Sequence, residues 1–254
     1  MIPAILTGVR LQMKQASRNP FDLSGVFVWP ILYASIAYYL LDAKDNPKLL
    51  LSASLGAAVM LMWSLVVIAS SGALEQQRWQ GTLELVVAAP TPLNAVIGPI
   101  CVAGALVGTY GIAATLLWGA VLFDVPVHIE HPLAFALAIP ACALAVGMLG
   151  LIMAATFVLY RASFHLGIAT QYPVWIVTGL LVPLSLLPSF VRPISWLLAP
   201  TWGFRGMQEA ALGGTPWPDI GMCVVLSVAY LAIGGTCLIA FEYVARARGS
   251  LRLT

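Results

Sequence analysis

Few residues in this sequence have the types and spacing that catalysis or metal binding requires. The densest group of potential metal ligands is His-Ile-Glu-His at 128–131. It lacks the HExxH spacing that brings two imidazoles to one face of a helix, and Pro126 and Pro132 place it in a short loop. We therefore predict a hydrated loop there and no metal bound by this chain.

Nucleophilic catalysis has equally little support. Ser70 and Ser71 precede Gly72, but no GxSxG motif surrounds them, and no histidine lies in the core of another apolar stretch to act as a base. None of the lysines occurs in a GxxxxGK[ST] motif, so the chain has no P-loop for ATP. We predict that the chain is not an enzyme and that any ATP it uses is hydrolysed by another polypeptide.

The overall composition predicts a membrane protein. Of 254 residues, 61% are hydrophobic and only 9% are charged, against roughly 25% charged in an ordinary soluble domain. So few charges could not keep large apolar patches apart in water. The net charge of +2 also offers no electrostatic signal for a nucleic-acid partner.

Six stretches without Asp, Glu, Lys or Arg are long enough to cross a bilayer, which needs about 20 apolar residues. We therefore predict an all-α polytopic membrane protein with six transmembrane helices in a single domain, residues 1–254. A further apolar run, 193–204, is too short to cross and contains two prolines, which favours a re-entrant or interfacial hairpin. The six stretches are 23–41, 49–74, 85–123 (with the span starting near Asn94), 131–160, 162–191 and 220–241.

The basic residues predict the orientation of these spans. Six crossings place both termini on one side; eight basic residues share that side and four lie opposite, so the termini are predicted to be cytoplasmic. Residues 1–20 carry Arg10 and Lys14 among apolar residues at helical spacing, which indicates an amphipathic helix on the membrane surface. A solvated basic lead-in to the first span is the alternative.

The predicted spans have no carboxylate, lysine or arginine near their middle. Carriers driven by protons or ions usually need such groups at depth, where they are costly and mark the pathway. Proton-coupled secondary transport is therefore disfavoured.

The longest predicted cytoplasmic loop, 72–92, has the features of a short helix of its own. Gly81 can break the preceding helix, Thr82 can cap a new one, and Glu84 falls in the first turn, where a negative charge favours the helix dipole. The result is a short amphipathic helix that ends before Pro90. From these residues alone, a mere connector stays open.

Arg78, followed by Gly-Thr-Leu-Glu at 81–84 and by Pro90, resembles the cytoplasmic loop of ABC type-2 transporter permeases, of the daunorubicin-exporter and polysaccharide-exporter kind. The pattern in that family is roughly E-[RK]-x-x-G-T-L-E-x-L-x-x-x-P, and its loop is a coupling helix that contacts a separate ATP-hydrolysing subunit. This chain departs at Gln77, where relatives often have glutamate, and Glu75 is the candidate replacement. The coupling residues implied by the resemblance and by the N-terminal helix are Arg10, Lys14, Glu75, Arg78, Gly81, Thr82 and Glu84.

The resemblance covers essentially the whole chain. It implies a cytoplasmic interface helix (1–20), a coupling helix between spans two and three (72–92) and an external re-entrant hairpin before the last span (188–217). It also implies a second permease subunit, identical or homologous, and a separate ABC ATPase subunit that would bind ATP and Mg²⁺. This chain would bind no cofactor and no nucleic acid, and it would lie among lipid in a bacterial inner (plasma) membrane.

The function implied is ATP-driven export of a drug-like amphipathic compound or a lipid. Aromatic residues on spans that line the pathway in this family suit such a substrate, although rings also stack on sugars, which keeps polysaccharide or glycolipid export open. Ordinary helix packing would explain the same residues, and an intramembrane enzyme or an ATPase-independent scaffold is the alternative of a different class. The candidate pathway residues are Trp29, Tyr33, Trp63, Tyr172 and Trp175.

Overall fold

The computed structural model describes residues 2–18, 20–41, 46–79, 81, 92–125, 127–157 and 163–248. Most of these residues lie in α-helices, and the described ranges contain no β-strand, which confirms the all-α prediction. In chain order the elements are α1 (Ile2–Arg18), α2 (Pro20–Leu41), α3 (Pro47–Trp79), α5 (Asn94–Phe123), α6 (Pro132–Phe157), α7 (Ser163–Val177), the 3₁₀ turn η1 (Leu184–Leu186), α8 (Val191–Trp196), α9 (Ala199–Leu212) and α10 (Trp217–Arg248).

Helix α3 is the central element of the bundle. It packs against α2, α5, α6, α7 and α9. Its apolar residues occupy every face, as expected of a helix that is surrounded by others. Leu55, Met62 and Trp63 are completely or almost completely buried, so the other helices are positioned largely by their contact with α3.

Residues without side chains allow α5 and α6 to approach α3 closely. A Cβ on Gly108 of α5 would lie 2.6 Å from Met62 Cγ, and a Cβ on Gly150 of α6 would lie 2.6 Å from Val66 Cγ1. Helix surfaces in such close contact gain dispersion energy, which is a main attraction between helices in lipid.

Four of the described helices, α3, α5, α6 and α10, are long and apolar enough to cross a membrane. The apolar stretch of α2 is shorter, Phe27–Ile36, and α7 has 15 residues. Helix α10 exposes large apolar side chains, among them Val225 and Ile239, as a lipid-facing helix does. The helices thus support a multi-pass membrane protein, while the count of six spans stays a prediction.

The predicted fifth span, 162–191, is not one continuous helix. Helix α7 ends at Val177, and Gly179 has a left-handed backbone (φ +79°) that side chains disfavour. Pro183 follows and has no backbone N–H to donate to a helix. The chain therefore turns through η1 before it enters α8.

The predicted hairpin segment, 188–217, contains the short helix α8 and the longer helix α9, separated by Leu197 and Leu198. This break lies inside the run 193–204, for which the sequence predicts no single regular helix. Helix α9 packs against α6, α10 and α3, and a Cβ on Gly203 would overlap the buried Cys142 side chain of α6. Whether the hairpin re-enters a membrane stays a prediction.

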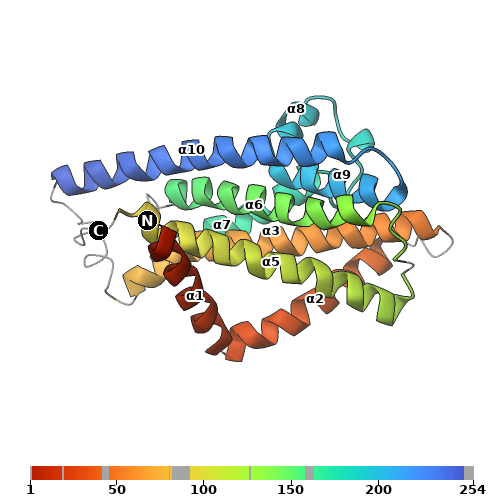
Figure 1. The fold of residues 1–254 in the computed structure, drawn as a ribbon, viewed down its shortest axis with the longest axis horizontal. Helices are drawn as coiled ribbons and strands as arrows, with labels where there is room; N and C mark the ends of the chain where they lie inside the picture. The colour runs from red at the N-terminus through yellow and green to blue at the C-terminus, as the bar shows by residue number, and fades with distance from the viewer. Residues whose placement is uncertain are drawn as a thin grey trace.

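The start of α1 and the end of α10 lie at the same end of the bundle, which we call the termini end (Figure 1). The end of α3 and the start of α5 lie there too, whereas α8, α9 and the start of α10 lie at the opposite, hairpin end. Helix α1 runs obliquely to the long helices and packs against α5, where Gly8 meets Pro99. Its predicted position on a membrane surface is untested.

Gly203→Ala should destabilise the fold by about 1–3 kcal/mol, because the new methyl group would overlap Cys142 in a closely packed contact. Gly221→Ala is the matched control, since a Cβ there has no neighbouring atom within 4 Å and alanine favours a helix over glycine by roughly 0.5–1 kcal/mol. Thermal unfolding in detergent, followed by tryptophan fluorescence, compares the two variants. Equal melting temperatures would contradict the close packing of α9 on α6.

Candidate functional site

At the termini end, Glu75 of α3 binds the first turn of α7. Glu75 is buried, and the backbone N–H of Phe164 donates a hydrogen bond to its Oε2 at 2.8 Å. The first N–H groups of a helix have no acceptor within the helix, and a carboxylate near them also interacts favourably with the helix dipole. Nearby, a Cβ on Gly167 would lie 2.5 Å from Ser71 Oγ, so α3 and α7 are in close contact at this end.

Glu242 makes the corresponding contact between α10 and α5. The backbone N–H of Leu93, the residue before α5, donates to Glu242 Oε2 at 2.8 Å. Asn94 Nδ2 donates to the carbonyl oxygen of Gly235 at 3.2 Å, about two turns before Glu242 on α10. Two side-chain hydrogen bonds therefore hold the start of α5 against the end of α10.

The predicted coupling residues are only partly described. Arg10 and Lys14 are exposed on α1. Gly81 is exposed, and its backbone is left-handed (φ +66°) two residues after the end of α3, where the sequence predicts a break. Glu75 points into the protein. Outside the described residues lie the side chain of Arg78, Thr82, Glu84 and the rest of the predicted coupling helix.

Three of the five candidate pathway residues form a cluster of rings between α2 and α7. The ring centroids of Tyr33 and Trp175 are 5.9 Å apart at an interplanar angle of 86°, and those of Tyr172 and Trp175 are 5.2 Å apart at 77°. The Tyr33 hydroxyl forms a 2.9 Å hydrogen bond with Ser64 Oγ of α3. Tyr172 is 58% exposed, so the cluster extends from the core to the surface of the chain.

The other two candidate residues have different surroundings. Trp63 is 1% exposed and belongs to the core around α3, where substitution would leave a large cavity. Trp29 is 46% exposed on α2 and lies against Gly25 of its own helix. Edge-to-face contacts thus distinguish Tyr33, Tyr172 and Trp175 as the connected group.

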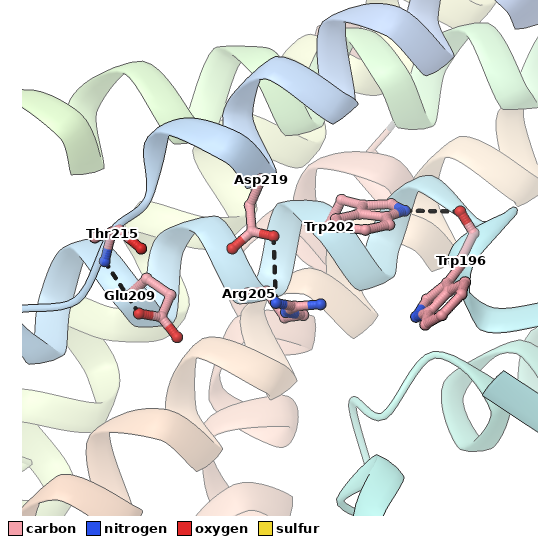
Figure 2. A network of polar contacts seen from close by, with 6 residues as sticks. All are labelled: Trp196, Trp202, Arg205, Glu209, Thr215 and Asp219. Carbon is pink, nitrogen blue, oxygen red and sulfur yellow. Dashed lines mark hydrogen bonds and ion pairs between the residues drawn. The ribbon is translucent and has the colours of Figure 1, made fainter. Parts of the chain in front are cut away.

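At the hairpin end, a polar and aromatic network connects α9 to its neighbours (Figure 2). Arg205 Nη2 lies 3.6 Å from Asp219 Oδ1 of α10, and the guanidinium carbon lies 5.2 Å from the centroid of the Trp202 ring. Trp202 Nε1 donates to the carbonyl oxygen of Trp196 in α8 at 2.7 Å. These contacts join both helices of the hairpin to the start of α10.

Glu209 organises the turn between α9 and α10. The backbone N–H of Thr215 donates to Glu209 Oε2 at 3.2 Å, as Figure 2 shows. The sequence alone suggests either a hydrogen-bonding or a solvated role for Glu209, and it does not predict the Arg205–Asp219 pair. The position of Asp219 at the start of the last apolar stretch, where a helix dipole favours an anion, is the signal that could have marked it.

The described ranges contain no group of three or more His, Cys, Asp or Glu residues placed to hold a metal ion. In the loop at 128–131, His128 Nε2 and Glu130 Oε1 are 4.0 Å apart, and both side chains are exposed. Among the described residues, the candidate functional features are the polar contacts between helices at both ends of the bundle and the aromatic cluster of Tyr33, Tyr172 and Trp175.

The sequence model of the family described as ABC-2 type transporter matches residues 3–212. The chain belongs to the ABC-2 type transporter family. The match begins in α1 and ends at the last residue of α9, and it confirms the resemblance drawn from the loop at 72–92. No curated protein matches this chain. An ABC-2 membrane domain is a transporter permease subunit, not itself an ATPase, and the family normally works with a separate ABC ATPase subunit.

Arg205→Ala should lower the melting temperature of this ABC-2 permease more than Asp219→Asn does. The side chain of Asp219 is 4% exposed and that of Arg205 is 43% exposed, so loss of the arginine leaves a buried carboxylate without its ion-pair partner. This loss should reduce the free energy of unfolding by about 1–3 kcal/mol. Asparagine instead removes the buried charge itself, and combining the two substitutions should recover part of the loss. The exposed Arg192→Ala on α8 is the control. A double variant no more stable than Arg205→Ala would contradict this account.

Proposed function

We propose that this chain is the membrane-spanning permease subunit of an ATP-driven ABC exporter. The family match over residues 3–212 carries the proposal. Because the sequence has no GxxxxGK[ST] motif, ATP and Mg²⁺ are assigned to separate ATPase subunits and no cofactor to this chain. Two permease subunits, identical or homologous, would enclose the substrate pathway, so one chain is half of the membrane part.

The termini end is the proposed cytoplasmic side. The start of α1 and the end of α10 lie at the same end of the bundle, which requires an even number of membrane crossings. The four long apolar helices provide four crossings, and α2 and α7 would provide two more. Basic residues favour the cytoplasm, and Arg10 and Lys14 lie exposed on α1, a helix that starts at this end. The proposed orientation places both termini in the cytoplasm and the hairpin outside, and the family resemblance favours a bacterial inner membrane as the location.

The ATPase would dock at the termini end. In this proposal Arg10, Lys14 and the segment 78–84 contact the ATPase, and the exposed Gly81 supports their access to a partner. Glu75 is assigned a different part, because it is buried and bound to Phe164.

The proposed substrate is a drug-like amphipathic compound or a lipid. The cluster of Tyr33, Tyr172 and Trp175 supports this choice, since its outermost ring is exposed and its faces can stack on an apolar or aromatic molecule. Sugar rings stack on the same kind of surface, so export of polysaccharide or glycolipid is the alternative that the assay below separates.

Purification in mild detergent, followed by mass spectrometry, tests the proposed function. We expect a P-loop ATPase to copurify, and its ATP hydrolysis to be stimulated by amphipathic drugs or lipids. Stimulation by glycans alone would replace the proposed substrate class. If no ATPase copurified under conditions that preserve a known ABC transporter, the proposed function would be wrong.

Gly81→Pro should lower the amount of substrate transported per ATP hydrolysed by about tenfold or more. The reason is that proline requires φ near −65°, whereas Gly81 has φ +66°. Gly81→Asn is the matched control: asparagine tolerates left-handed backbone, and a Cβ at this position meets no atom within 4 Å. Transport per ATP hydrolysed, measured in proteoliposomes with the copurified ATPase, compares the variants. Similar behaviour of both variants would contradict a role for the backbone at Gly81.

A further inference from the structure

Two hydrogen bonds to glutamate side chains lie on either side of the segment 80–91 in the chain, and each joins a buried or half-buried glutamate to the beginning of another helix. Glu75 lies just before this segment and accepts from Phe164 of α7. Leu93 lies just after it and donates to Glu242 of α10. The end of α3, the start of α5 and the end of α10 lie at the termini end of the bundle (Figure 1), and the bond between Phe164 and Glu75 places the start of α7 beside the end of α3.

Water has little access to these two hydrogen bonds, so it cannot readily replace either partner. Glu75 is 9% exposed and Leu93 is 3% exposed. A hydrogen bond in such a dry environment is electrostatically stronger than one in water, and breaking it leaves a polar group without solvent. Each carboxylate therefore holds its helix start more firmly than an exposed cap would.

Close packing limits movement between α3 and α7, whereas α5 and α10 are held together at this end by side-chain hydrogen bonds. Gly167 of α7 has no room for a side chain against Ser71 of α3, and Asn94 of α5 donates to Gly235 of α10. Interiors packed to this density transmit a displacement from one element to the next instead of absorbing it.

We propose that Glu75 and Glu242 are positioning residues that make α3 move with α7, and α5 with α10, when the ATPase displaces the cytoplasmic side of the permease. The proposal rests on the proposed function for the source of the displacement, whereas the two hydrogen bonds exist in the chain alone. Because α7 carries Tyr172 and Trp175, the Glu75 contact connects the coupling side to the aromatic cluster along one helix.

The first experiment measures hydrogen exchange in the isolated, full-length permease. Glu75→Ala should speed exchange in the first turn of α7 by roughly 2- to 30-fold, the range that corresponds to loss of a side-chain acceptor at a helix N-terminus. Glu75→Gln keeps an acceptor oxygen and should stay close to the unmodified protein. Glu242→Ala and Glu242→Gln should show the same contrast at Leu93, and Glu130→Ala, an exposed carboxylate at the hairpin end, is the control.

The second experiment measures transport per ATP hydrolysed in the complex with the ATPase. Both alanine variants should lower this ratio several-fold while ATPase binding is unchanged, and both glutamine variants should restore most of it. A purely structural role would lower the amount of folded protein, which the exchange pattern of the central helix α3 reports, without changing the ratio.

Three results would overturn the proposal. The first is unchanged exchange at both helix starts in the alanine variants. The second is weaker ATPase binding by Glu75→Ala with unchanged exchange in α7, which would make Glu75 a partner contact. The third is an unaltered transport ratio despite faster exchange. If the unmodified chain bound no ATPase, the proposed function would fail, and the exchange experiment would still decide whether the two contacts hold the helices.

Discussion

The burial of α3 is the constraint on which the rest of the structure depends. This helix is apolar on all sides and contacts five other helices, so its neighbours must present surfaces that fit it. Glycines on α5 and α6 meet Met62 and Val66 at distances that exclude any larger residue. In lipid, where apolar side chains gain little by leaving the solvent, such close fit replaces the hydrophobic effect as the source of specificity.

Three glutamate side chains connect helices near their ends. Glu75, Glu242 and Glu209 each accept a hydrogen bond from a backbone N–H near a helix start or in the turn before one. The physical reason is that these N–H groups have no partner within their helix, and leaving them unsatisfied in a dry environment is costly. These three carboxylates thus connect helices at both ends of the bundle.

An arrangement with carboxylates at the helix ends and aromatic side chains between α2 and α7 suits a permease of the ABC-2 type transporter family. The proposed path for an amphipathic molecule would need apolar and aromatic surfaces, and Tyr33, Trp175 and Tyr172 form an aromatic surface across two helices. The proposed switch would need a rigid connection from the cytoplasmic side to that surface. Helix α7 is suited to both proposed roles, since Glu75 binds its first turn and the aromatic residues lie two to three turns further along.

The sequence by itself determined the membrane class, the all-helical fold, the break at Gly81 and the family, because span length, glycine conformation and short motifs act locally along the chain. Only the tertiary structure showed that Phe164 donates to Glu75, and Leu93 to Glu242, across separations of 89 and 149 residues. It also separated the aromatic residues, with Trp63 in the core and Tyr172 at the surface, and divided the predicted fifth span at Gly179. These features depend on which helices become neighbours, and that choice is made by the shape of packed surfaces, which no local pattern of residues records.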